Sequence, residues 1–328
     1  TQSTWGQRSS LQSKMNSFAL SSLLVISICL LRIPDSFAGR HLSQAAEEQS
    51  MLYHNGPLLS GKVSVNLIWY GNFKPSQKAI VVDFIASLSS SENKASPSVA
   101  TWWNSIHLHY NKVGRRESLS LYLGKQISDE GYSLGKSLTD GQIEMLAARG
   151  GQEYAINVVL TSADVVVERF CLSRCGSHGS AFSAVKPTIG RKSTKFAFIW
   201  VGNAETQCPG YCAWPFHQPV YGPQGPPLMA PNGDVGLDGM IINLGTLLAG
   251  TVTNPFGNGF YQGPKEAPLE AASACTGVYG KGAYPGYAGD LLVDAVTGAS
   301  YNANGNDGRK YLLPALYDPS TATCSTLI

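Results

Sequence analysis

The hydrophobic pattern along the chain becomes regular at residue 61. From 61 to 70, apolar side chains alternate with Ser64 and Asn66 before the run becomes wholly apolar, which is typical of a strand with at least one buried face. Pro75 follows, and apolar residues then recur every three to four positions as far as Leu88. That spacing predicts an amphipathic helix with a proline in its first turn, so this part of the chain opens as an α/β fold.

The longest apolar segment after residue 60 covers 237–252, where apolar side chains surround most of a predicted helix. Such a helix is expected to be buried at the centre of the fold. Shorter patterns predict the other helices and strands of a mixed sheet. They are a helix over 99–106, a strand over 119–123, a helix over 139–148 that begins with a capping box, and strands over 154–160, 164–170 and 195–201.

The N-terminal part of the chain carries a targeting pattern. Residues 18–31 are apolar but too few to span a bilayer comfortably, and small residues stand at the −3 and −1 positions of a cut after Ala38. We therefore expect a cleaved secretory signal over 15–38, and no membrane span once it is removed. The alternative is an uncut anchor, against which Arg32 argues because it interrupts the apolar run.

Two polar segments flank this signal. Residues 1–14 precede a credible start at Met15 and are interpreted as translated upstream sequence or a cloning remnant, so they take no part in the predicted fold. Residues 39–59 are polar and rich in turns, which predicts a short N-terminal arm. One α/β domain is then expected over 60–328.

Six cysteines remain after the expected cut, and all lie in the second half of the chain. An even number in an oxidising compartment predicts up to three disulfides, with 15 pairings left open. The alternative is a four-thiolate zinc site built from the two C-x3-C pairs, although this spacing is looser than that of the usual zinc ribbons. The six are Cys171, Cys175, Cys208, Cys212, Cys275 and Cys324.

Charge narrows the choice of partners. Only 14% of the residues are charged and the formal net charge is +2, with no long basic block. Nucleic-acid binders need a concentrated basic surface, so a polynucleotide partner is not expected.

A secreted α/β domain invites a search for a hydrolase site. The sequence has no Gly-x-Ser-x-Gly elbow, no phosphate-binding loop and no His-Glu-x-x-His pair. His178 is predicted to lie in a glycine-flanked turn beside Cys175, as a structural hydrogen-bonding group rather than a catalyst. His107 and His109 are predicted to alternate on a strand as exposed side chains.

Oxygen-bearing side chains recur at alternate positions over 231–239, as they do in calcium loops. The bidentate Glu expected at position twelve is replaced by Asn243, so a turn that caps the following helix through Asp234 or Asp238 is the better interpretation. The Asn-Gly and Asp-Gly pairs in 302–308 predict a hairpin without a ligand.

Aromatic residues near turns and strand ends are interpreted first as core residues and second as a platform for stacking sugars. They are Trp69, Tyr70, Trp102, Trp103, Trp200, Trp214 and Tyr261.

Six long motifs stand in a fixed order along the chain. They are GKVSVNLIWYGNF (61–73), PSVATWW (97–103), FCLSRCGSHG (170–179), CPGYCAWP (208–215), LAGTVTNPFGNG (248–259) and AASACTG (271–277). Together they resemble the plant Exordium or phosphate-induced protein family, and the match runs from about Leu52 to the C-terminus. The resemblance implies a secreted protein of the apoplast and cell wall, linked to cell expansion and to hormone- or nutrient-responsive growth, with no established catalytic activity to transfer.

A more distant similarity connects the chain to secreted microbial proteins that resemble metalloproteases. It places Thr246, Leu247 and Gly250 where a zinc histidine, a general-base glutamate and a third ligand would lie. These side chains cannot bind zinc or activate water, so the similarity implies a zincin-like fold that has lost its metal. The residues expected around the remaining cleft are His178, Asp234, Asp238, Thr246 and Glu270.

The sequence therefore predicts a non-catalytic wall protein that recognises a cell-wall glycan or an apoplastic or receptor protein, without a cofactor. The alternative is a secreted hydrolase, either a wall-glycan hydrolase or a metalloprotease, with an unrecognised site. A glycan hydrolase needs two carboxylates across a cleft. The candidates are Asp234, Asp238, Glu266 and Glu270.

Overall fold

A computed structural model describes residues 50–90, 96–115, 119–151, 155–172, 174–182 and 195–328. The compact unit is Ser50–Ile328, so the last ten residues of the expected arm lie within it. The expected upstream sequence, the signal over 15–38 and residues 39–49 lie outside the described residues.

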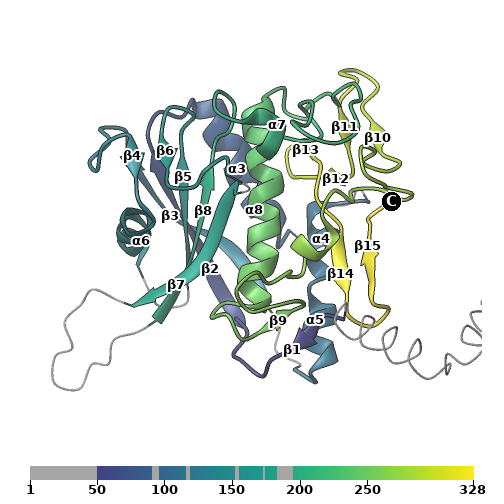
Figure 1. Ribbon diagram of the computed structural model, residues 1–328, viewed down its shortest axis with the longest axis horizontal. Helices are drawn as coiled ribbons and strands as arrows, with labels where there is room; N and C mark the ends of the chain where they lie inside the picture. Colours follow the sequence, from purple (N-terminus) through teal and green to yellow (C-terminus); the bar gives the residue numbers. More distant parts are fainter. Residues whose placement is uncertain (1–49, 91–95, 116–118, 152–154, 173, 183–194) are drawn as a thin grey trace, which may run out of the picture. The chain divides into compact units, whose positions relative to one another are not determined.

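A five-stranded mixed sheet forms one side of this unit (Figure 1). Its strands are β2 (Gly61–Tyr70), β3 (Leu119–Asp129), β5 (Ala155–Thr161), β7 (Gly176–Phe182) and β8 (Lys195–Gly202). They lie in the order β3-β2-β5-β8-β7; the first four run parallel, and β7 pairs antiparallel with β8 at the edge. The predicted mixed sheet is confirmed.

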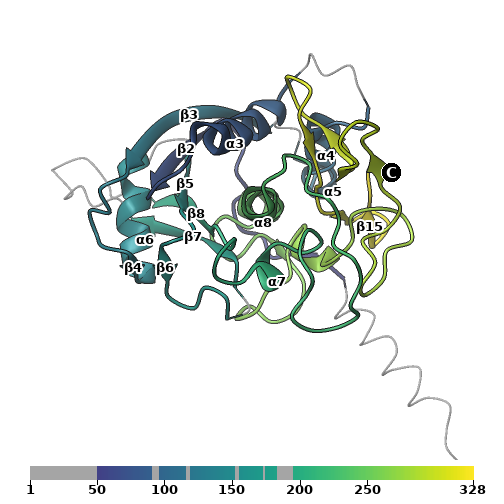
Figure 2. The same cartoon turned by 90° about the horizontal axis from the view of Figure 1, so that it is seen from above.

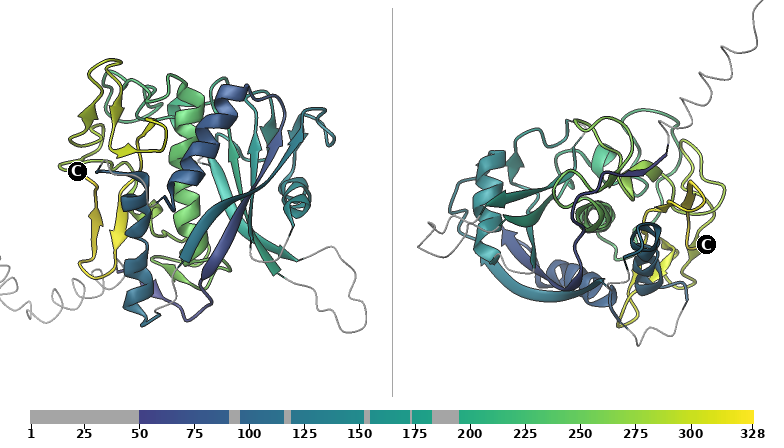
Figure 3. Two further views of the ribbon diagram at one scale, coloured as in Figure 1. Left: turned by 180° about the vertical axis from the view of Figure 1, so that it is seen from behind. Right: turned by 90° about the horizontal axis from the view of Figure 1, so that it is seen from below.

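Helices cover both faces of the sheet because β2 sends alternate side chains to two separate cores. Trp69 packs with α3 (Pro75–Ser87) and α8 (Val235–Thr253), whereas Tyr70 packs on the opposite face with α6 (Asp140–Ala147). Figure 3 shows α3 and α8 on the same side of the sheet. The apolar positions that recur every 3.6 residues in the helices therefore pack against those that recur every 2 residues in the strands, and the helices form layers on the sheet.

Helix α8 is the buried central helix that the sequence predicted. Seen from above, it stands between the sheet and the C-terminal part of the chain (Figure 2). Its length and hydropathy would suit a membrane span, but 78% of the segment is buried inside the fold, which accounts for its apolar character. Asp234 caps it, since its side chain accepts a hydrogen bond from the backbone N–H of Leu237 at 2.9 Å.

Short elements complete the unit, and most of them lie after α8. Strand β12 pairs with β13, which confirms the hairpin predicted over 302–308. The short helices are α4 (Val99–Asn104), α5 (His107–Lys112), α7 (Pro209–Cys212), η1 (Ala148–Gly150) and η2 (Ser273–Cys275). The short strands are β1 (Leu52–Tyr53), β4 (Ser137–Leu138), β6 (Val166–Val167), β9 (Phe260–Tyr261), β10 (Leu292–Val293), β11 (Ser300–Tyr301), β12 (Ala303–Asn304), β13 (Lys310–Tyr311), β14 (Leu316–Asp318) and β15 (Thr323–Ser325).

Two predictions about histidines are wrong. His178 lies in strand β7 rather than in a turn; its glycine neighbours fit there because a Cβ at Gly179 would press on the Phe198 ring at 3.2 Å. His107 and His109 lie on helix α5, not on a strand. His109 is fully buried against the edge of the Phe260 ring, and burial lowers its pKa to about 4.

All six cysteines form disulfides, which rules out the four-thiolate zinc alternative. Cys171–Cys208 and Cys175–Cys212 run side by side and tie the segment before β7 to α7. Cys275–Cys324 ties η2 to β15. The first two pairs join one C-x3-C motif to the other, a choice that the sequence left open.

Candidate functional site

Gly250 lies on the stretch of α8 that faces β7, at a position where the distant similarity implied a lost ligand. A Cβ at Gly250 would collide with Oε2 of Glu270 and come within 3.2 Å of Nε2 of His178. The space beside this glycine is therefore filled by two of the residues expected around the cleft.

His178 and Glu270 form a closed pair there. Nε2 of His178 lies 2.6 Å from Oε2 of Glu270, and Nδ2 of Asn254 donates to Oε1 of Glu270 at 2.6 Å. The two side chains are only 14% and 10% exposed. Both carboxylate oxygens are thus engaged by protein groups, while Nδ1 of His178 is buried without a partner among the described residues. The arrangement links β7 to the C-terminal end of α8 through Glu270, and His178 also lines a cavity of about 260 Å³ with Asp140, Glu144 and Arg174.

The neighbouring residues of α8 do not extend this pair. The hydroxyl of Thr246 donates to the carbonyl of Ile242 at 2.9 Å. The side chain of Leu247 is half-buried and fills the space that a Cβ at Gly176 would occupy. Over the described part of the chain, no group of three His, Cys, Asp or Glu side chains is placed to bind a metal.

Asp234 and Asp238 lie at the other end of α8, away from His178. Besides capping the helix, Asp234 accepts a hydrogen bond from Nε2 of Gln77 on α3 at 2.8 Å. Asp238 is buried and accepts from the backbone N–H and the side-chain Nδ2 of Asn232, at 2.8 and 2.7 Å. Burial raises the pKa of Asp238 to about 7 despite these two donors. Both carboxylates therefore hold local structure, and neither lines any of the four cavities described for this part of the chain, nor does Glu266 or Glu270.

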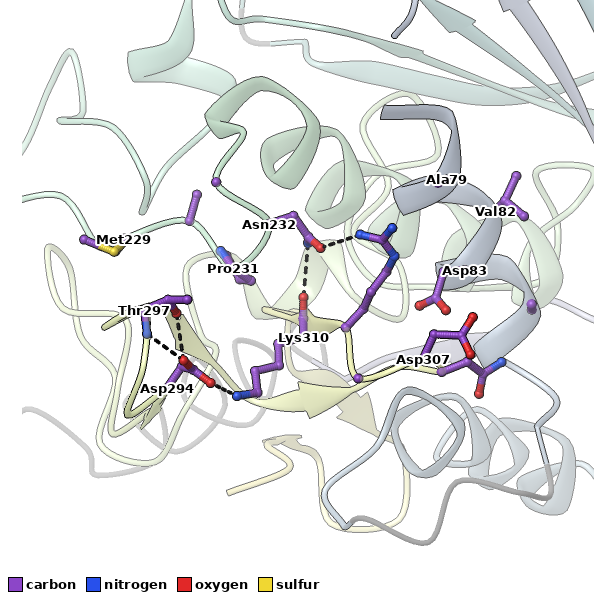
Figure 4. Close-up of a pocket in the computed structure, with 16 residues that line it drawn as sticks. Ala79, Val82, Asp83, Met229, Pro231, Asn232, Asp294, Thr297, Asp307 and Lys310 are labelled. Carbon is purple, nitrogen blue, oxygen red and sulfur yellow. Dashed lines mark hydrogen bonds and ion pairs between the residues drawn. The ribbon is translucent and has the colours of Figure 1, made fainter. Parts of the chain in front are cut away.

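A cavity of about 840 Å³ opens beside Asn232, between α3, the turn before α8 and the β12–β13 hairpin (Figure 4). Its lining is both apolar and charged, and we call it the polar cavity after its charged side chains. Sequence reasoning missed this cavity because its walls come from segments far apart in the chain. The Asn- and Asp-rich turn in 302–308 was the available signal, and it was interpreted as a hairpin alone. The charged residues of the lining are Asp83, Asp294, Asp307, Arg309 and Lys310.

Asp294 and Lys310 neutralise each other, and Asp83 is buried. Nζ of Lys310 is bonded to the carboxylate of Asp294. Oδ2 of Asp83 accepts a hydrogen bond from the hydroxyl of Tyr311 at 2.7 Å. Burial raises the pKa of the Asp83 carboxyl, with the Tyr311 hydrogen bond and the Arg309 charge acting in the opposite direction.

A second site, which we call the aromatic groove, lies among the loops before α8 and after η2. It consists of two cavities of about 440 and 360 Å³ that adjoin because Trp214, Pro219, Pro223 and Gly286 line both. No Asp, Glu, Lys or Arg is present in either lining, as far as the described residues extend.

The aromatic groove exposes large rings. Tyr221 is 76% exposed and Tyr284 is 64% exposed, and the ring of Tyr284 lies 5.1 Å from that of Tyr287. Trp214 is half-buried in the lining, whereas the other six aromatic residues singled out in the sequence are buried in the core. The priority given to the core is therefore confirmed for those six, and Trp214 remains available to a ligand.

The fold and its cavities define a disulfide-bonded α/β protein whose candidate binding sites lie mainly in its C-terminal half. Residues 51–327 match the family model of the phosphate-induced protein 1 conserved region. The chain belongs to this family, which also contains the Exordium proteins, and the family's names indicate a growth-related protein of plants.

Known relatives match over almost their whole lengths. The chain is 65% identical to Protein PHOSPHATE-INDUCED 1 of Nicotiana tabacum, over 95% of this chain and 98% of that protein. It is 66% identical to Protein EXORDIUM-like 1 of Arabidopsis thaliana, over 85% and 90%, and 62% identical to Protein EXORDIUM of the same plant, over 93% and 98%. No solved structure matches the chain, so the zincin-like relationship stays a prediction.

Proposed function

We propose that this chain is a secreted, non-catalytic protein of the cell wall that takes part in growth by binding a neutral wall polysaccharide along the aromatic groove. The observation that carries the proposal is the set of rings, half-buried Trp214 and exposed Tyr221 and Tyr284, in a groove whose described lining contains no Asp, Glu, Lys or Arg. Flat aromatic faces bind the apolar faces of sugar rings, and their polar edges remain free for water or hydroxyl groups.

Secretion is supported by the signal predicted over 15–38 and by the three disulfides. Disulfides persist in oxidising compartments and are rare in the cytosol. A mature chain cut after Ala38 would retain all six bonded cysteines.

A binding role is favoured over hydrolysis by the state of the carboxylates near α8. Hydrolysis of a glycan needs one carboxyl group to protonate the leaving oxygen and a second to act on the opposite face of the sugar. Asp234, Asp238 and Glu270 are instead held by hydrogen bonds from the protein.

The test is retention of the purified mature chain on insoluble or immobilised wall polymers. We expect retention on a neutral polymer, for which xyloglucan and cellulose are the probes, and at least tenfold weaker binding by Tyr221→Ala and Tyr284→Ala. Tyr122→Ala is the matched control, because Tyr122 is 49% exposed on β3, outside the groove. Equal retention of all three variants, a preference for anionic polygalacturonate, or release of shortened products would overturn the proposal.

A further inference from the structure

The polar cavity beside Asn232 is distinct from the aromatic groove, with which it shares no lining residue. Its volume of about 840 Å³ lies within the range of small-molecule sites, roughly 300–1,000 Å³. One part of its wall is apolar and is formed by Ala79, Val82 and Ala86 of α3, together with Met229. The remaining wall carries charges of both signs.

The charges left over after internal pairing are one cation and two carboxylates. The Arg309 guanidinium makes no ion pair within the described chain, and its one hydrogen bond is a long one, 3.4 Å from Nη1 to Oδ1 of Asn232. Asp307 is exposed and has no partner among the residues that the structure places. Asp83 lines the cavity, although the residue is only 8% exposed and its Oδ2 accepts a hydrogen bond from the Tyr311 hydroxyl.

Arg309, Asp83 and Asp307 give the lining of this cavity charges of both signs. Figure 4 shows Asp83 and Asp307 near one another on one side of the cavity, with the Asp294–Lys310 pair on the other side. A guanidinium presents a planar set of donors that matches a carboxylate, and two carboxylates present acceptors that match an ammonium group. A purely anionic ligand would meet the two aspartates, and a purely cationic ligand would meet Arg309.

We propose that this cavity binds a small zwitterion, a free α-amino acid or a short peptide with both termini unblocked. The carboxylate of the ligand lies on Arg309, and its ammonium group lies between Asp83 and Asp307. Its apolar side chain lies against α3. This site goes beyond the proposed polysaccharide function and does not depend on it.

The experiment measures binding to the purified mature chain by titration calorimetry. Leucine and leucyl-leucine are the probes, and comparing them shows whether the cavity prefers a free amino acid or a short peptide. Leucinamide lacks the anionic pole and N-acetyl-leucine lacks the ammonium pole. We expect at least one of the two probes to bind. If leucine binds, leucinamide and N-acetyl-leucine should each bind at least tenfold more weakly than leucine. If only leucyl-leucine binds, the dipeptides blocked at one end should each bind at least tenfold more weakly than leucyl-leucine.

Variants assign each pole to its residue. Arg309→Met should remove the preference for a free carboxylate, and Asp307→Asn should reduce the preference for a free ammonium group. Lys265→Met and Glu266→Gln are the controls, because both residues are exposed and lie outside the cavity lining. Tyr284→Ala should leave this binding unchanged, so failure of the aromatic groove and failure of this site are distinguishable.

The proposal is overturned if neither probe binds at millimolar concentration, or if blocked and unblocked compounds bind equally. It is also overturned if neither probe binds but a neutral sugar such as cellobiose binds in this cavity, which a loss of cellobiose binding in the Arg309→Met variant would show. Wild-type affinity in both Arg309→Met and Asp307→Asn would show that binding occurs elsewhere.

Discussion

At the scale of single residues, the most informative group is the carboxyl of Asp238. It lies in the first turn of α8, where a negative charge near the helix N-terminus is favourable, and two donors of Asn232 bind it. Burial nevertheless dominates and raises its pKa to about 7, from an ordinary value of 3.8. The group therefore shows that desolvation outweighs two hydrogen bonds and a helix terminus at this position.

This raised pKa makes stability depend on pH in a definite direction. Below about pH 4 the carboxyl is protonated in both states. Between about pH 4 and 7 the unfolded chain releases a proton that the folded chain keeps, so the contribution of Asp238 to the free energy of unfolding falls as pH rises. The loss reaches at most roughly 4 kcal/mol. His109 acts in the opposite direction over the same range, because its pKa is lowered to about 4. Asp238→Asn removes this titrating group and keeps His109, so its free energy of unfolding minus that of the wild type should increase as pH rises, as measured by urea unfolding from pH 4 to 7.5. Glu266→Gln, an exposed control, should keep the wild-type slope; a wild-type slope in Asp238→Asn would contradict the assignment.

At the scale of elements, long segments with a clear hydrophobic period were predictable and an edge strand was not. The predicted strand over 61–70 and the observed β2 coincide, and the predicted helix over 237–252 lies within α8. Strand β7 was missed because its residues, Gly176–Phe182, show no apolar alternation. It is a strand because β8 supplies its hydrogen bonds and its glycines allow close approach, and both causes are tertiary.

The candidate sites differ in the same way. Sequence similarity brought His178 and Glu270 into one predicted cleft, and the structure joins them across 92 positions, but as a closed pair. The polar cavity could not be predicted, because Asp83 comes from α3 whereas Arg309 comes from a hairpin more than two hundred residues later. A local pattern carries no information about such an approach.

The contact between α8 and β7 can be tested at Gly250. Alanine favours a helix over glycine by up to about 1 kcal/mol, yet Gly250→Ala should destabilise the protein by about 1–3 kcal/mol, because its Cβ would displace Glu270 from His178. Gly141→Ala in α6 is the control: its Cβ would meet nothing closer than 4.0 Å and should be neutral or stabilising. Urea unfolding gives both values, and a stabilised Gly250→Ala variant would show that the pair is loosely held.

At the scale of the whole unit, α8 separates a regular half from an irregular one. The sheet and its helices carry long hydrogen-bonded elements, whereas both candidate binding sites draw most of their lining from the loops and two-residue strands of the second half. Such loops have few backbone hydrogen bonds of regular elements, so covalent links contribute to their order. The disulfides are placed accordingly, and Cys275–Cys324 anchors the end of the chain to η2.

The three disulfides should therefore differ in what they contribute. Removing Cys275–Cys324 with a Cys275→Ser, Cys324→Ser variant opens a loop of 49 residues and should lower the free energy of unfolding by about 4 kcal/mol on the chain-entropy model. Cys171–Cys208 closes a loop of 37 residues, but Cys175–Cys212 closes almost the same loop. Removing Cys171–Cys208 with a Cys171→Ser, Cys208→Ser variant therefore opens only the short ring that the two bonds close together, so the free energy of unfolding should fall by about 2.5 kcal/mol.

Urea unfolding of the two double-serine variants measures both losses. The variants are a matched pair, because Cys275 and Cys208 are both buried, at 2% and 7% exposure. Equal losses, or a larger loss at Cys171–Cys208, would mean that local packing rather than loop closure sets the contribution of these bonds.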